Sequence, residues 1–142
     1  MSKRKNYNGV QINPSPTIVA PAGADIEDVR NKIMKFDDNG NLVLATAGTD
    51  MPMGVALIEE GYNDITGVES GKVVTGDDVT VQIKEMGVVI AGATIKKGQE
   101  VAAGADGLAA VAVSGNYVLG VALDDAEAEE YLHIQLTKYQ KA

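Results

Sequence analysis

The sequence predicts an all-β protein, and three features support this fold class: an internal repeat, abundant glycine and short alternating apolar runs. The chain has 142 residues, of which 16 are glycine and only 4% are aromatic. Glycines placed between short apolar runs favour tight turns between short strands. We therefore expect about eight to ten strands in one domain, spaced as in a small β-barrel or sandwich.

The internal repeat is clearest in a Gly-Val-Ala-Leu box. The box at residues 54–57 recurs at residues 120–123, which is 66 positions later. A repeat of this kind indicates that one small β unit was duplicated and packed on its copy. Two further pairs align at this offset without a gap: Leu42 with Leu108, and Val29 with Ile95. The duplication predicts an interior with pseudo-twofold symmetry.

An extended N-terminal arm is expected over residues 1–20, followed by the β-barrel domain over residues 21–142. Pro14 and Pro16 interrupt regular strand pairing in the arm, which carries three basic residues and no acidic one. The arm is either a solvated terminus or a segment that lies along an acidic partner. Six arm residues are candidates for partner contact, by charge or by apolar anchoring: Lys3, Arg4, Lys5, Tyr7, Val10 and Ile12.

The strands of the first copy follow from apolar runs and turn signals. Asp25 is a candidate cap for a single helical turn that places Ile26, Val29 and Ile33 on one face, although the second copy has a strand–turn–strand pattern there. Asn-Gly at residues 39–40 is a strong hairpin signal. Strands are expected at residues 32–36, 42–46, 54–58 and 79–84, with a short one at 73–74.

The second copy repeats this order. Residues 87–91 form a continuous apolar run, which is typical of a buried strand. The chain ends in residues 131–137, where Leu132, Ile134 and Leu136 alternate with polar residues and are expected to face the core. His133 then lies on the outward face.

Composition and charge exclude several classes of function. Residues 21–142 contain nine Lys or Arg and 20 Asp or Glu, a net charge of −11, and such an acidic body argues against direct nucleic-acid binding. The absence of cysteine excludes disulfides and makes a zinc site improbable. No apolar run is long enough to span a membrane, and no apolar stretch follows the basic start as a signal peptide requires. Synthesis in the cytoplasm is expected.

No motif in the sequence indicates catalysis. The segment 37–41 is similar to a calcium loop, but loop positions six and twelve are Leu42 and Gly48 rather than Gly and Glu, so we interpret it as a turn. The acidic run 124–130 is interpreted as a solvated loop, a weak cation site or a contact patch. His133 is the only histidine, and the sequence places neither a base nor a ligand cluster beside it. We predict no enzyme activity, no cofactor and no metal.

Seven segments with turn-and-strand patterns stand out along the body: 20–23, 53–57, 79–81, 87–92, 95–101, 105–107 and 119–123. Taken together, these seven segments resemble the capsid decoration, or head cement, proteins of tailed bacteriophages. The resemblance covers about residues 18–137 and does not rest on catalytic signatures. It implies a compact barrel of the β-tulip kind that assembles as a homotrimer on the outer surface of the virion. It also implies that the partner is the major capsid protein, whose neighbouring subunits the trimer clamps.

Several alternatives stay open. A related β module could serve as a head-fibre or tail-tube component of the virion. A soluble module that binds a carbohydrate or small molecule would need an aromatic platform, but the five tyrosines are scattered along the sequence. An enzyme is disfavoured, because the chain has one histidine, no cysteine and no convergent motif.

Overall fold

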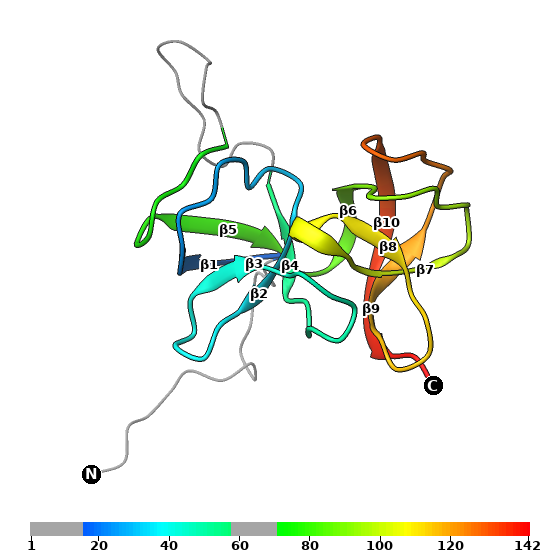
Figure 1. Cartoon of the computed structure of the whole chain (residues 1–142), viewed down its shortest axis with the longest axis horizontal. Coiled ribbons are helices and arrows are strands. Elements are labelled where there is room, and N and C mark those ends of the chain that lie inside the picture. The colour runs from blue at the N-terminus through cyan, green and yellow to red at the C-terminus, as the bar shows by residue number, and fades with distance from the viewer. Residues whose placement is uncertain (1–15, 58–70) are drawn as a thin grey trace.

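The computed structural model describes residues 16–57 and 71–142, and this part of the chain is all-β with ten strands and no α-helix (Figure 1). The all-β prediction is confirmed. The strands are β1 (Thr17–Pro21), β2 (Ile33–Phe36), β3 (Leu42–Leu44), β4 (Gly54–Ala56), β5 (Asp78–Gln82), β6 (Glu85–Ile90), β7 (Glu100–Ala103), β8 (Ala109–Val111), β9 (Tyr117–Ala122) and β10 (Tyr131–Gln140). A short 3-10 turn, η2 (Ala105–Gly107), precedes β8. The first strand thus begins inside the range predicted for the arm.

The ten strands form two five-stranded antiparallel sheets with the same topology. The first sheet has the order β1-β5-β4-β2-β3, and the second has the order β6-β10-β9-β7-β8. Each strand of the first sheet therefore has a counterpart five strands later. The two sheets lie side by side along the longest axis of the molecule (Figure 1). This identity of order bears out the predicted duplication.

Strand pairing departs in places from the 66-residue offset that the sequence indicates for the first elements of each copy. Gly54 and Gly120 are equivalent, as the repeat indicates. Gly54 of β4 pairs with Met34 of β2, and Gly120 of β9 pairs with Val101 of β7, at the same place in each sheet. Elsewhere the offset changes with each turn. Leu42 is equivalent to Ala109 rather than to Leu108. Ile95 is equivalent to Ile26 rather than to Val29, since the two isoleucines form matching bridges.

Each sheet is open rather than closed into the predicted barrel. In the first copy a single parallel bridge between Ala22 and Leu42 brings the end of β1 to the start of β3, and Gly23 N–H donates to the Leu42 carbonyl at 2.9 Å. Ala91 and Ala109 form the same bridge in the second copy. One bridge bends a sheet strongly but leaves most of its two edge strands unpaired, so neither copy is a closed barrel.

The predicted helical turn after Asp25 is wrong, although its three apolar residues are buried as expected. Ile26 forms a bridge with Val73, and Val29 N–H donates to the Gly71 carbonyl at 2.8 Å. Tertiary hydrogen bonds to a distant segment thus satisfy the backbone groups that a helix would have satisfied locally. The short strand predicted at residues 73–74 is reduced to this one bridge.

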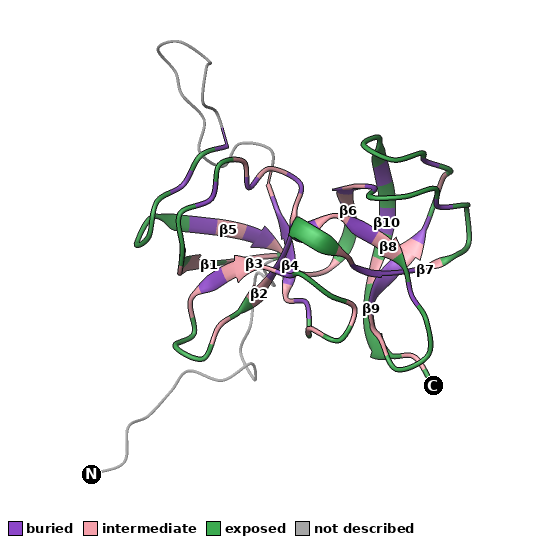
Figure 2. Ribbon diagram, in the orientation of Figure 1, coloured by how far each residue is buried: buried purple, intermediate pink, exposed green. Residues whose placement is uncertain are grey.

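The core consists of aliphatic side chains and extends from one copy into the other. One buried cluster lies wholly within the first copy and includes Met34 and Val79. A second cluster fills the other copy but also contains Ile33, Ala45 and Val55 from the first. Figure 2 shows buried residues along the strands of both sheets and where the two sheets meet. The shared cluster joins the two copies, because apolar burial is the main stabilising contribution to such contacts.

The contact between the copies does not have the predicted twofold symmetry. Asn31 of the first copy meets β6 of the second, where its side-chain Nδ2 donates to the Val88 carbonyl at 3.0 Å. A twofold interface would place the counterparts of these two residues in the same contact. Those counterparts are Gly98 and Val19, and Val19 is 58% exposed. The copies therefore meet head to tail, through different surfaces of the same unit.

This asymmetry gives a testable difference between two equivalent positions. Ile33, fully buried in the shared cluster, corresponds to Glu100, which is half-buried. We expect Ile33→Ala to lower the free energy of unfolding by about 3 kcal/mol, as for other large-to-small changes in a core. Glu100→Ala should cause a much smaller loss. Urea unfolding followed by circular dichroism measures both, and equal losses would contradict the head-to-tail interface.

Candidate binding groove

The six arm residues predicted to contact a partner, Lys3, Arg4, Lys5, Tyr7, Val10 and Ile12, lie outside the described residues. The structure does show where the arm is attached. The Pro16 carbonyl accepts a hydrogen bond from Ile83 N–H at 2.8 Å, and Thr17 pairs with Gln82. The arm therefore joins the body beside the end of β5, where the first copy passes into the second.

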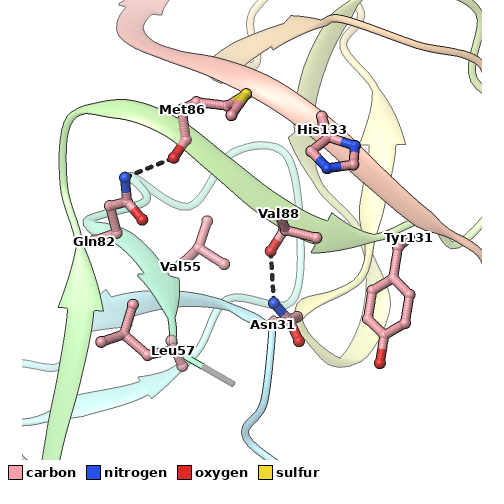
Figure 3. A pocket seen from close by; sticks show the side chains of 9 residues that line it. Asn31, Val55, Leu57, Gln82, Met86, Val88, Tyr131 and His133 are labelled. Carbon is pink, nitrogen blue, oxygen red and sulfur yellow. Dashed lines mark hydrogen bonds between the residues drawn. The ribbon is translucent and has the colours of Figure 1, made fainter. Parts of the chain in front are cut away.

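A groove of about 460 Å³ lies at the same place, between the ends of β4 and β5 and the outer face of β6 and β10 (Figure 3). This volume is within the usual range for ligand sites, about 300–1,000 Å³. The lining is mainly apolar: of its nine residues, three besides the tyrosine have polar side chains. It consists of Asn31, Val55, Ala56, Leu57, Gln82, Met86, Val88, Tyr131 and His133.

Asn31 is the most unusual residue of the groove. Its backbone has a φ of 57°, in the left-handed region, and the counterpart in the second copy is Gly98 with a φ of 89°. Asparagine tolerates this conformation better than most residues other than glycine. The side chain explains why asparagine stands here, since its Nδ2 donates to the Val88 carbonyl. The backbone carbonyl of Asn31 also accepts from Ile90 N–H at 3.3 Å. Asn31 thus caps the outer edge of β6.

This arrangement leaves one buried acceptor unused. Asn31 is 7% exposed, and its Oδ1 has no hydrogen-bond partner. The hydrogen bond from Nδ2 to a carbonyl fixes the orientation of the amide, because the opposite orientation would set two acceptors against each other. A buried polar atom without a partner is costly. The groove therefore presents a carbonyl acceptor surrounded by apolar side chains.

Gln82 closes the end of the groove at which the arm is attached. Its Nε2 donates to the Met86 carbonyl at 2.6 Å and to the Lys84 carbonyl at 3.0 Å. These bonds hold the turn between β5 and β6 against the groove wall. Figure 3 shows Gln82 and Asn31 on the two sides of Val55, each bonded to a residue of β6.

The structure gives His133 a partner that the sequence analysis missed. His133 is on the outward face of β10, as predicted, and its Nδ1 lies 2.8 Å from Oδ2 of Asp124. Burial raises the pKa of the Asp124 carboxyl, but the hydrogen bonds from the His133 side chain and backbone together lower it by more. The pKa of Asp124 is therefore below its ordinary value. Both side chains are more than 40% exposed. Exposed pairs of this kind contribute little to stability.

The acidic segments accept hydrogen bonds from their own loop or from a neighbouring one. Asp37 Oδ1 accepts hydrogen bonds from the backbone N–H of Asn39 and Asn41, which confirms the interpretation of this segment as a turn. In the acidic run, Asp125 accepts from Lys97 N–H and Glu127 accepts from the Thr94 hydroxyl. Within residues 16–57 and 71–142, no three His, Asp or Glu side chains are grouped so that they could hold a metal ion. In the same ranges no helix is long and apolar enough to cross a membrane.

Asp50 makes the loop between β3 and β4 sensitive to pH. Its carboxylate accepts from the backbone N–H groups of Thr46 and Ala47 and pairs with Lys35 at 3.1 Å. The Thr46 N–H, followed by Lys35, holds the pKa of the Asp50 carboxyl below its ordinary value. A carboxyl with a lowered pKa in the folded state stabilises the fold above its unfolded pKa, and this contribution is lost as the pH falls through the folded value.

Asp50→Asn should therefore destabilise the protein by about 1 kcal/mol at pH 7. The difference from the wild type should shrink as the pH falls below 3.8, the ordinary pKa of the carboxyl. Thermal unfolding across this range measures the effect, with the exposed Asp38→Asn as the control. A difference between Asp50→Asn and the wild type that is constant with pH would contradict this account.

Two exposed tyrosines on β10 do not form one aromatic platform. Tyr131 lines the groove described above. Tyr139 lines a smaller depression of about 190 Å³ together with Tyr117, Met51 and Pro52. The two belong to separate sites, at opposite ends of β10.

Comparison with known proteins gives a likeness of structure. No protein-family model matches the chain, and no curated protein matches it. Among solved structures, the N base of head fiber gp8.5 in bacteriophage phi29 is similar, with a TM-score of 0.59 and 22% sequence identity. The chain shares the fold of this head-fibre base. The alignment covers 87% of this chain and 97% of the other, so the likeness includes both copies of the repeat.

Proposed function

We propose that the protein is a structural component of a bacteriophage virion, located on the outside of the head. The observation that carries this proposal is the fold shared with the head-fiber base of bacteriophage phi29 along nearly the whole of both chains. The segments noted in the sequence support it independently, because they resemble those of head decoration proteins. Such a protein would be made in the host cytoplasm and added to the shell.

The finer proposal is that the protein binds major capsid protein and clamps neighbouring subunits, as a homotrimer. Its charge distribution suits this role. The arm carries three basic residues and no acidic one, whereas residues 21–142 have a net charge of −11. An arm that becomes ordered on binding loses entropy but can cover a large area of its partner. Many copies around a shell would add modest individual contacts into firm attachment.

A second candidate is that the chain forms the base of a head fibre. The similar structure favours it, since that protein is itself a head-fiber base. The two candidates differ in copy number, because a clamp is needed at every set of neighbouring subunits and a fibre base only where a fibre stands. Neither role requires catalysis, and we propose that the protein is not an enzyme.

Co-sedimentation with expanded, undecorated phage heads tests these proposals. Saturation near one copy per capsid subunit would support the clamp, and saturation at a much lower ratio would support the fibre base. Size exclusion of the free protein, run in parallel, would show whether trimers exist before binding. Absence of binding to heads would contradict the proposed location on the head and turn attention to a tail component or to the ligand-binding alternative.

A further inference from the structure

The groove beside β6 has features that suit a peptide segment. It combines apolar side chains with a buried acceptor, Asn31 Oδ1, that has no partner within the described chain. Two of its apolar side chains, Met86 and Tyr131, are 54% and 58% exposed. A ligand that fits must bring apolar groups and one N–H or O–H donor into reach. An extended peptide offers both, since each non-proline residue supplies a backbone donor.

The N-terminal arm is tethered at the edge of this groove. Fifteen residues precede Pro16, whose carbonyl is bonded to Ile83 N–H, and the neighbouring Gln82 lines the groove. Ile12 is only four residues from Pro16, a reach of at most about 14 Å for an extended chain. A tethered segment has a high effective concentration at a site that it can reach.

The composition of the arm also matches the groove and its surroundings. Tyr7, Val10 and Ile12 supply apolar side chains at short intervals, and residues 3–5 add three positive charges. The body to which they would bind has a net charge of −11. Asp124, which is bonded to the groove residue His133, and Glu85, which precedes the groove residue Met86 in β6, add negative charge near the groove.

We propose that the arm of the free protein docks in the groove of its own chain. In this arrangement the apolar residues between Tyr7 and Ile12 lie among Leu57, Met86 and Tyr131, and a backbone N–H of the arm donates to Asn31 Oδ1. The inference concerns the protein without shells, so it stands or falls separately from the proposed virion role. If both are right, the arm leaves the groove when it binds the shell, and the groove keeps the apolar residues covered until then.

Limited digestion of the full chain with chymotrypsin tests the docking, because the protease cuts after Tyr7 only when the arm is free. The variant Met86→Glu/Tyr131→Ser should release the arm, and cleavage after Tyr7 should become about tenfold faster, as for loss of a modest local interaction. Both substituted side chains are exposed in the body, so the fold is retained. The matched control is Val113→Glu/Val74→Ser, which changes two exposed apolar residues that do not line the groove.

The same experiment separates the possible occupants. Docking within one chain predicts a cleavage rate that does not depend on protein concentration, whereas exchange of arms between copies predicts slower cleavage at higher concentration and would overturn the proposal. Equal rates in the wild type and the groove variant would also overturn it.

Methyl NMR of the full chain gives a second, independent measurement. The arm variant Tyr7→Ser/Val10→Ser/Ile12→Ser should shift the Met86 methyl resonance. The similarly exposed Met51, which lies in the other depression, should not move. An unchanged Met86 resonance would contradict docking.

Discussion

Gly120→Ala should destabilise the protein by about 3 kcal/mol or more, and Gly54→Ala should have an effect of similar size, because both force a backbone shift in a packed core. A Cβ at Gly120 would lie 2.3 Å from the Gln135 carbonyl oxygen, and one at Gly54 would lie 2.2 Å from that of Gln82. Each carbonyl belongs to the neighbouring strand, which cannot move without breaking its ladder. The Gly-Val-Ala-Leu box begins with glycine for this reason in both copies.

The control for this prediction is Gly98→Asn. Gly98 has a φ of 89° and no atom within 4 Å of the position of a Cβ, and asparagine already occupies the equivalent position of the first copy at Asn31. We expect a loss of no more than about 1 kcal/mol there. Urea unfolding of the three variants makes the comparison. A loss at Gly54 or Gly120 as small as that at Gly98 would show that the two strands can separate at little cost.

The parts of the fold that could be predicted are those encoded by nearby residues. The Asn-Gly turn predicted the β2–β3 hairpin, and alternation in residues 131–137 placed Leu132 and Ile134 in the core. The box at Gly54 and Gly120 revealed the duplication, since the close approach of two strands leaves room only for glycine in each copy. In each case a local steric or periodic requirement determines the residue type.

The register between the copies could not be predicted from residue likeness. Aligning Leu42 with Leu108 joins two leucines, yet the fully buried residue of the second copy is Ala109, and Leu108 is half-buried. Successive residues of a strand face opposite sides, so an error of one position exchanges the inner and outer faces. Only strand pairing reveals the correct register.

The groove was missed because its lining comes from strands that are distant in the sequence. One signal was present. Asn31 replaces Gly98 at a turn that requires a left-handed residue, and this departure from glycine indicates that the side chain has a role. Recognising it required the correct alignment of the copies at that turn. The asymmetric contact between the copies was missed for a similar reason, since a duplication by itself does not determine which surfaces meet.

Deleting residues 2–16 should abolish binding to phage heads while leaving the fold intact. The deletion removes all six predicted contact residues of the arm and ends before β1, so the ten strands and both core clusters are unchanged. Loss of three basic groups and three apolar anchors would leave only the acidic body to face the shell, where association is slower and weaker. Co-sedimentation with heads measures binding, and circular dichroism checks the fold.

The groove variant Met86→Glu/Tyr131→Ser serves as the complementary control, because it changes the body and keeps the arm complete. If the arm makes the shell contact, this variant should bind heads at least as well as the wild type, since no arm residue has to leave the groove first. The deletion and the groove variant should therefore act in opposite directions. Full decoration by the truncated protein would show that the body carries the contact, and the six arm residues would then have no part in it.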